Sequence, residues 1–329
     1  MSLPPEPRAN PDLVGHGEAQ RQLEAAARSG RLHHAWLLAG APGIGKATLA
    51  WRFARWLLAD MPRGEVPLHL PPGHPVFRRV AAGAHADVLA LTPGGEGRKR
   101  RTIAVEDARE AVRFLTLTPA EGGWRVVLID EPETMEAASA NTLLKTLEEP
   151  NRRTVLLLAS SAPGRLLPTI RSRCRRLDLF PLDAPEMEGL LARWLPDLPG
   201  EDRGRLARLA EGAPGRALLL AEGEGVELAK LAEKTLASLP RIDALALADR
   251  ITGKDGAGFA PFFALLTRAM QAALREAAAG GGAEGWVAAR PLGAWAEAAA
   301  EIARLAETAE RLSLDRRQAV IEAMRLLRG

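Results

Sequence analysis

Cysteine is almost absent from this sequence: its 329 residues include a single one, Cys174. One thiol excludes a disulfide within the chain and a cysteine-rich zinc site, and it suits a reducing compartment. Residues 1–12 lack the apolar core of a signal peptide, and no stretch of the sequence approaches the roughly 20 apolar residues that cross a membrane. These absences predict a soluble, cytoplasmic protein that makes no contact with a membrane.

Aromatic residues and net charge are also scarce. Aromatic side chains make up 4% of the chain, tyrosine is missing, and the formal net charge is +3. A charge this small gives no sign of a nucleic-acid-binding protein, so local basic patches would have to carry such a function. Apolar residues, by contrast, make up 47%, and a chain of this length can form two or three domains.

The first half of the chain alternates short apolar runs with helical patterns, which is typical of an α/β fold. The runs are continuously apolar rather than alternating, and this predicts a parallel sheet covered on both faces. The predicted strands are 35–40, 87–93, 124–130 and 153–160. Apolar residues at helical spacing predict helices over 105–115 and over 139–149, the latter with Leu143, Leu144 and Leu147 facing inward.

No strand is expected beyond about residue 180. We expect an α/β domain over 1–180, a small helical lid over 181–223 and an all-helical C-terminal domain over 224–329. Loops are predicted for the proline-rich residues 61–75 and for the basic residues 94–101. The last two helices are indicated by apolar residues at helical spacing, namely Ile302, Leu305, Ala309 and Leu312, then Val320, Met324 and Leu327.

The stretch GAPGIGKATLA, residues 40–50, is close to a phosphate-binding loop of the pattern G-x-x-x-x-G-K followed by Ser or Thr. A predicted strand precedes it and a helical pattern follows, which is the context that such a loop requires. Its backbone amides would surround phosphate oxygens and Lys46 would reach the outer phosphates. The residues expected to bind a nucleotide here are Gly40, Pro42, Gly43, Ile44, Gly45, Lys46, Ala47 and Thr48.

Ala47 departs from this pattern, because the usual Ser or Thr supplies the hydroxyl that binds magnesium. Thr48 does not replace that hydroxyl, since the next residue of a helix is rotated by about 100°. Phosphoryl transfer depends on metal placement more than nucleotide binding does. We therefore expect ATP as a possible ligand bound without hydrolysis, and magnesium bound weakly if at all.

The run VVLIDE, residues 126–131, ends in two acids that could complete a nucleotide site. Asp130 would hold magnesium through water, and Glu131 would polarise the attacking water. Either acid alone would be an ordinary residue at the end of a strand. Their pairing after a strand and downstream of the phosphate-binding loop favours the functional interpretation.

Four arginines lie within TIRSRCRR, residues 169–176. A run of charges such as this one is often a solvated face or a general phosphate patch. Its position after a predicted strand favours a third interpretation. An arginine at the edge of a domain can enter the nucleotide site of a neighbouring subunit and stabilise the charge on the transferring phosphate.

Together these motifs resemble the clamp-loader branch of the AAA+ ATPases over almost the whole chain. The resemblance is carried by LIDEPETMEAASANTLLKTLEEP (128–150) and RTVLLLASSAPGRLLPTIRSRC (153–174), and residues 13–50 and 310–320 agree with it. Within that branch the chain is similar to a non-motor subunit of the bacterial replicative DNA polymerase. The resemblance implies a stator that joins gamma- or tau-like motor subunits and a delta subunit in a hetero-pentamer, which loads the sliding clamp on primed DNA.

The resemblance also implies roles for single residues. Arg173, in the Ser-Arg-Cys motif, is the implied arginine finger that acts in trans on an adjacent motor subunit. Ser160 or Ser161 would be the first sensor of the nucleotide state, and Arg216 would be the second sensor, on the helical lid.

Further implied features concern the two ends of the chain. Val14 and Gly15 would line the adenine pocket, and the C-terminal helices would form the collar of the ring. The chain departs from the family over residues 58–85, where the usual member has four zinc-binding cysteines. The remaining His69, His74 and His85 have no acid or thiol at ligand spacing, so no zinc is expected.

Two alternatives stay open. The chain could be an active ATPase motor of the same family, although Ala47 fits a stator better because a motor needs hydrolysis. It could also be a stand-alone nucleic-acid-binding P-loop protein that uses the basic residues 97–101 and 171–176 as phosphate contacts. The nearly neutral overall charge and the collar-like C-terminal helices speak against this second alternative.

Overall fold

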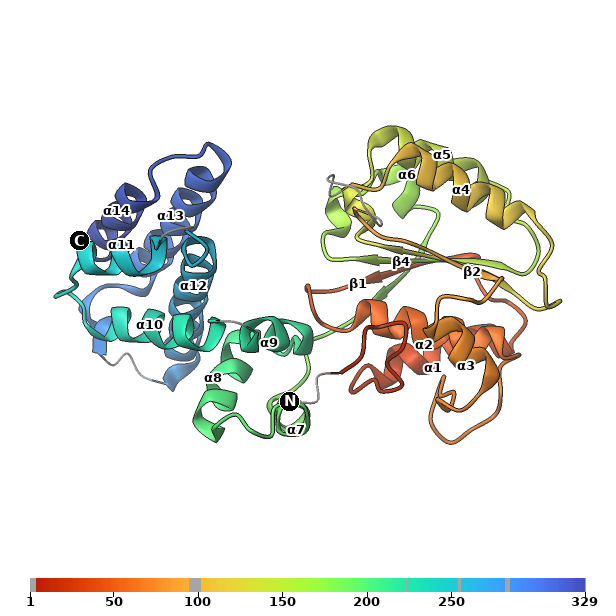
Figure 1. Ribbon diagram of the computed structural model, residues 1–329, viewed down its shortest axis with the longest axis horizontal. Helices are drawn as coiled ribbons and strands as arrows, with labels where there is room; N and C mark the ends of the chain where they lie inside the picture. The colour runs from red at the N-terminus through yellow and green to blue at the C-terminus, as the bar shows by residue number, and fades with distance from the viewer. Residues whose placement is uncertain (1–3, 95–101, 223, 254–255, 282–284, 329) are drawn as a thin grey trace. The chain divides into compact units, whose positions relative to one another are not determined.

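The computed structural model describes residues 4–94, 102–222, 224–253, 256–281 and 285–328 (Figure 1). The predicted basic loop 94–101 lies outside these residues except for Gly94. Within the chain, contacts define two compact units, the first formed by Met1–Leu195 with Gly212–Gly215 and the second by Pro196–Glu211 with Arg216–Gly329. The first unit holds all the described strands, and the second is built from helices.

The first unit is built on a five-stranded sheet in the order β2-β3-β4-β1-β5, with every pair parallel. Its strands are β1 (Ala35–Ala39), β2 (Val88–Leu91), β3 (Arg125–Asp130), β4 (Thr154–Ser160) and β5 (Arg175–Asp178). β1 and β4 are buried along their whole length, as is β3 up to Asp130, and this is why their sequences are continuously apolar. The predicted parallel α/β sheet is confirmed.

Helices cover both faces of this sheet (Figure 1). Alternate strand residues point to opposite faces, so Trp36 packs with α1 and α2 while Leu37 packs with α4 and α5. The helices of this unit are α1 (Gly17–Arg28), α2 (Lys46–Leu58), α3 (Pro75–Ala81), α4 (Val105–Thr116), α5 (Ala137–Glu148), α6 (Pro168–Arg171) and α7 (Ala184–Trp194), with short 3-10 turns η1 (Pro132–Thr134) and η2 (Pro163–Arg165). Leu143 and Leu147 are buried as expected, whereas Leu144 is only half-buried.

The edge strand β5 was not predicted from the sequence. Of its four residues only Leu177 is buried, and Arg175, Arg176 and Asp178 are exposed. A side-chain pattern of this kind carries no strand signal. Backbone pairing with β1 forms the strand, and its charged residues are typical of an edge, where they discourage pairing with another chain.

Arg55, a buried arginine of α2, attaches the N-terminal segment to this helix. Arg55 has no ion pair with a described residue, its guanidinium lies 4.5 Å from the centre of the Phe77 ring, and burial lowers its pKa to about 10. Its donors are satisfied by main-chain oxygens instead, those of Pro7 (3.3 Å), Arg8 (2.6 Å) and Asn10 (2.6 Å). The segment 7–10 is therefore held by hydrogen bonds to a charged group, which are stronger than neutral ones.

The Arg55→Leu variant tests this attachment. It leaves three carbonyl oxygens without their charged donor, so the free energy of unfolding should fall by about 2 kcal/mol or more. Urea denaturation of the full chain measures the change. Arg63→Leu, at an exposed position, is the matched control, and an equal loss in both variants would contradict the role of Arg55.

Two of the three histidines in the region without cysteines accept hydrogen bonds from nearby backbone amides, and the third is exposed. His74 caps α3 by accepting from the Val76 amide, His85 accepts from the Asp87 amide at 3.1 Å, and His69 is exposed. Among the described residues, no three His, Cys, Asp or Glu side chains are grouped so that they could hold a metal ion. Residues between α2 and α3 form no regular element, as the proline-rich sequence predicted.

His85 makes stability dependent on pH. Its Nδ1 accepts a hydrogen bond, so the neutral ring carries its proton on Nε2, 3.6 Å from Glu121 Oε1. Burial lowers the pKa of His85, outweighing the attraction of Glu121, while Arg79 lowers it further and Asp87 raises it. The folded pKa is below the unfolded one, so the stabilising contribution is present above the unfolded value and is lost as the pH falls through the folded one.

The melting temperature should therefore fall between about pH 7.5 and about pH 5.5. His85→Asn keeps an oxygen that can accept from the Asp87 amide but does not titrate, so it should make this fall smaller. Calorimetric scans of both proteins at the two pH values provide the measurement. A fall of the same size in the variant would show that His85 is not responsible.

The described helices of the second unit enclose a single apolar core. Phe259, Phe262 and Phe263 lie at its centre, and Trp295 and Ile302 pack from α13. Leu312, the last residue of the predicted periodic pattern, lies just after α13, which ends at Arg311, and is exposed. The helices are α8 (Gly200–Ala210), α9 (Pro214–Ala221, which begins in the first unit), α10 (Gly225–Ala237), α11 (Ala244–Thr252), α12 (Phe259–Glu276), α13 (Leu292–Arg311) and α14 (Arg316–Arg328), with the turns η3 (Ala277–Gly281) and η4 (Gly285–Ala289).

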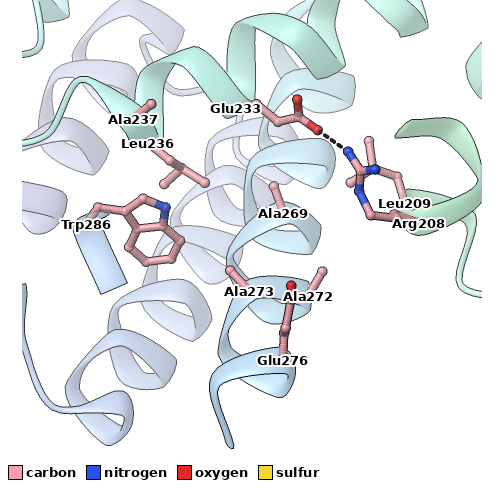
Figure 2. A pocket seen from close by; sticks show the side chains of 10 residues that line it. All are labelled: Arg208, Leu209, Glu233, Leu236, Ala237, Ala269, Ala272, Ala273, Glu276 and Trp286. Atoms are coloured by element: carbon pink, nitrogen blue, oxygen red, sulfur yellow. Dashed lines mark ion pairs between the residues drawn. The ribbon is translucent and has the colours of Figure 1, made fainter. Parts of the chain in front are cut away.

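An open hollow with a volume of about 210 Å³ lies within this unit, between α8, α10, α12 and η4, and Figure 2 shows the side chains that line it. The Trp286 ring forms one side and packs edge-on against Trp295, and an ion pair of Arg208 with Glu233 (3.6 Å) forms the other. Across the described residues of both units, no helix is long and apolar enough to cross a membrane.

Candidate functional site

Three segments that the sequence singled out meet at the carboxyl-terminal ends of the parallel strands. The phosphate-binding loop follows β1, Asp130 ends β3 and Ser160 ends β4. β4 lies between β1 and β3, and all three strands run parallel, so their carboxyl ends lie side by side. The fold therefore brings together residues that are far apart in the chain.

Hydrogen bonds to its carbonyl oxygens hold the phosphate-binding loop in place. Because these oxygens are already satisfied, the loop keeps its shape without a ligand, and the first amides of α2, which have no acceptor within the helix, remain available for an anion. The hydrogen bonds are those from Lys46 Nζ to the oxygens of Gly40 (3.0 Å) and Ala41 (2.9 Å), from the Gly215 amide to that of Gly43 (2.8 Å) and from His16 Nε2 to that of Ile44 (2.9 Å).

The backbone favours glycine at three positions in and beside the loop. Gly43 and Gly45 have φ angles of 76° and 107°, a region that side chains rarely allow. A Cβ on Gly215 would lie 3.0 Å from both the Cα and the oxygen of Gly43. The start of α9 thus lies backbone to backbone against the phosphate-binding loop.

Lys46 is the most constrained side chain of the site. It is 6% exposed, and its ammonium donates a third hydrogen bond to Ser161 Oγ at 2.7 Å. An ammonium has three protons, so all its donors are used. Burial lowers the pKa of Lys46, and the negative charges of Asp130, Glu133 and Glu131 oppose that effect.

The two acids where β3 ends, Asp130 in the strand and Glu131 just after it, differ in environment. Burial, and then the charge of Glu131, raise the pKa of Asp130, whose Oδ1 accepts from the Glu131 amide at 3.2 Å. Glu131 itself is exposed and has a φ angle of 50°. Asp130 therefore lies where its charge acts on Lys46, while Glu131 faces solvent.

The donor set fits a phosphate group better than a magnesium ion. Lys46 and the amides of the loop supply positive charge and hydrogen-bond donors, as phosphate binding requires. Ala47 and Thr48 are both half-buried in the first turn of α2, and Ala47 offers no oxygen to a metal. A bound nucleotide would place its negative phosphates here, and the carboxylate of Asp130, whose charge acts on Lys46, is a candidate to hold magnesium through water.

The segment expected to line the adenine pocket, Val14 and Gly15, is linked to the phosphate-binding loop by the next residue, His16. Gly15 has a φ angle of 72°, and a Cβ on it would lie 2.3 Å from Leu182 Cδ2. Its oxygen accepts from Gln20 Nε2 at 3.1 Å. His16 follows directly and binds Ile44; burial lowers its pKa. The role of Val14 and Gly15 in nucleotide binding stays a prediction.

The two arginines singled out by the resemblance each bind a main-chain oxygen and a glutamate carboxylate. Arg173, in the first unit, donates to the Thr169 oxygen at 2.9 Å and to Glu148 Oε1 at 2.6 Å. Arg216, in the second unit, donates to the Ala210 oxygen and to Glu211 Oε2 at 3.1 and 3.0 Å. Glu211 also accepts from Arg268 and Arg275.

Sequence reasoning missed Glu133 and His16. Glu133 accepts hydrogen bonds from the end of β4, and His16 binds the phosphate-binding loop. Glu133 is one of three acids in the sequence DEPE, residues 130–133, and no spacing distinguishes it from the other two. The resemblance also left open which serine meets the site, and the structure brings Ser161 to Lys46 and directs Ser160 to Glu133.

The part of this chain that holds Lys46, Asp130 and Arg173 is similar in sequence to known proteins. Residues 15–183, just over half of the chain, match the model of a family described as DNA polymerase III, delta subunit. A DNA polymerase III subunit delta' of Yersinia pestis is 35% identical over 242 residues, which is 72% of this chain and 69% of that protein. The chain belongs to the delta-prime family of bacterial DNA polymerase III.

Two further relatives and one solved structure are similar to this chain to different extents. The delta' subunit of Pseudomonas aeruginosa is 41% identical over 59% of this chain, and that match spans 57% of the relative, less than two thirds of its length. DNA polymerase III subunit tau of Escherichia coli is 30% identical over 76% of this chain and 39% of its own. A gamma subunit-related protein of Thermotoga maritima is 20% identical, covering 93% of this chain and 98% of its own, with a TM-score of 0.44.

The variant Ala47→Thr tests whether the missing hydroxyl limits metal binding at this site. If it does, the affinity for a nucleotide should rise about tenfold in the presence of magnesium, because the oxygen of the added hydroxyl can coordinate the metal ion. It should not change when EDTA removes the metal. Titration of a fluorescent ATP analogue measures both. Equal affinities of variant and parent with magnesium would contradict the assignment.

Proposed function

We propose that the chain is a clamp-loader subunit that acts as a stator and supplies Arg173 in trans to a neighbouring motor subunit. The neighbour would be a subunit of the gamma or tau kind, in a hetero-pentamer that also holds a delta subunit. The assembled complex would place a sliding clamp on primed DNA. The names of the relatives support this context, and the geometry of Arg173 carries the proposal.

Arg173 lies on a firmly anchored segment. Ile170, in α6, is completely buried, and Cys174 packs against the same core, where burial raises the pKa of its thiol to about 12. The Arg173 amide donates to the Ile170 oxygen at 3.1 Å. The main chain on both sides of Arg173 is therefore fixed, while its side chain is about one third exposed.

The internal partner of Arg173 does not prevent such a role. Its ion pair with Glu148 joins side chains that are 34% and 50% exposed. Pairs this exposed contribute at most about 1 kcal/mol, which a triphosphate of a neighbouring subunit outweighs. Arg173 is thus pre-positioned by its backbone and only weakly retained by its own chain.

The chain's own site supports the role of a stator over that of a motor. The loop and Lys46 offer a phosphate cradle, so ATP binding is part of the proposal, but Ala47 lacks the ligand on which hydrolysis depends. The proposed organisation is an ATPase-like domain over 1–180, a lid over 181–223 that carries Arg216 as second sensor, and a collar over 224–329.

Arg173→Ala in the reconstituted complex is the decisive variant. It should leave assembly intact and lower DNA-stimulated ATP hydrolysis about tenfold or more at the site that receives the side chain, because a finger stabilises charge on the transferring phosphate. Arg171→Ala, exposed in the same basic run, is the matched control. Unchanged hydrolysis by the Arg173 variant would remove the finger from the proposal.

The isolated chain separates the alternatives. Steady ATP turnover of ~1 per second or more, abolished by Lys46→Ala, would make the chain a motor. Binding of primed DNA by the lone chain with a steep dependence on salt would favour a stand-alone nucleic-acid-binding protein. A stator gives neither result.

A further inference from the structure

Glu133 joins the ends of two strands that carry the site. It lies in the turn η1, directly after β3, and its carboxylate accepts three hydrogen bonds from the end of β4. Oε2 accepts from Ser160 Oγ at 2.8 Å, and Oε1 accepts from the amides of Ser161 at 2.8 Å and Ala162 at 3.1 Å. A single side chain thus fixes three consecutive residues.

The turn that holds Glu133 is itself well supported. Pro132 is buried, and the Glu131 amide donates to the oxygen of Ala159, on β4, at 3.1 Å. The Thr134 hydroxyl donates to the Glu131 oxygen at 2.8 Å. Because its own backbone is fixed against β4, the Glu133 carboxylate has little freedom to follow a movement of the residues that it binds.

Ser161 carries this constraint to the phosphate-binding loop. Its hydroxyl accepts the shortest of the three hydrogen bonds of the Lys46 ammonium, 2.7 Å against 2.9 and 3.0 Å. The other two acceptors, the oxygens of Ala41 and Gly40, belong to the loop itself. Ser161 is therefore the one partner that ties Lys46 to a different strand.

We propose that Glu133 is a positioning residue that fixes Lys46 through Ser161 and so prepares the loop for the phosphates of a nucleoside triphosphate. The ligand named here rests on the proposed function, whereas the coupling from Glu133 to Lys46 does not. Without Glu133, the Ser160 hydroxyl and the Ser161 amide lose their acceptor, and the Ala162 amide keeps only Ser160 Oγ, at 3.2 Å. Ser161 then leaves its place, and the Lys46 ammonium loses the partner that directs it.

Geometry and charge can be separated at this position. Glu133→Ala removes both. Glu133→Gln removes the charge but keeps one oxygen for the amides of Ser161 and Ala162, and its amide group can donate to Ser160 Oγ, since a hydroxyl also accepts. If hydrogen bonding sets the position of Lys46, the Gln variant should behave like the parent and the Ala variant should not.

The reactivity of Lys46 reports its position without any nucleotide. The chain has six lysines, and Lys145 and Lys234 are exposed and serve as internal references. Brief acylation of the full-length chain with acetic anhydride, followed by peptide mass spectrometry, gives the rate at Lys46 relative to these two. In the parent this rate should be low, because the ammonium is buried and fully hydrogen-bonded.

Glu133→Ala should raise the relative rate at Lys46 about fivefold, the effect of losing one hydrogen bond. Ser161→Ala should raise it equally, and the double variant should raise it no further, because both changes break the same route. Glu133→Gln should restore the low rate. Glu110→Ala, which removes an exposed carboxylate from the same unit, should leave it unchanged.

An unchanged rate at Lys46 in Glu133→Ala, or additive effects in the double variant, would overturn the inference. If Glu133→Ala does not fold, Ser161→Ala decides alone, since a parent-like rate there breaks the route. Titration with mant-ATP adds a second reading, in which Glu133→Ala and Ser161→Ala weaken binding about fivefold. If the parent binds no mant-ATP, nucleotide binding fails as a function while the acylation rates still decide the inference.

Discussion

The placement of the Lys46 ammonium is the interaction on which the site depends. This charge is buried where β1 ends and is acceptable there only because three oxygens receive its protons. Two of those oxygens come from its own loop, and the third comes from Ser161 after β4. The order of the strands, with β4 beside β1, is therefore a condition for keeping this lysine charged and in place.

The restraint around the phosphate-binding loop is distributed over several parts of the first unit. His16 binds it from the segment before α1, the Gly215 amide binds it at the start of α9, and Glu133 acts on it from the neighbouring strands. The contacts of His16 and Gly215 end on main-chain oxygens of the loop, and that of Glu133 reaches the Lys46 ammonium through Ser161, so none of them involves the side chain at position 47. This explains how a loop with Ala47 keeps the form of a phosphate cradle.

Arg173 is held in the opposite way. Its backbone is anchored by neighbours that pack against the core, but its guanidinium donates only to one half-exposed carboxylate, that of Glu148, to the main-chain oxygen of Thr169 and to the Ser172 hydroxyl at 3.5 Å. A buried, fully hydrogen-bonded lysine suits a site that works within the chain. A weakly paired arginine on a rigid segment suits a side chain that acts on another molecule. Moving the Lys46 ammonium thus costs more free energy than moving the Arg173 guanidinium.

The sequence by itself determined the parallel sheet and the position of the phosphate-binding loop, because continuous apolar runs and a glycine-lysine pattern are local signals. It also indicated the family. Only the tertiary structure decided that β5 forms, since its pairing with β1 leaves no trace in side chains that are mostly charged. The same holds for Glu133, Ser161 and His16, whose partners are set by strand order and by contacts between segments far apart in the chain, which no local pattern encodes.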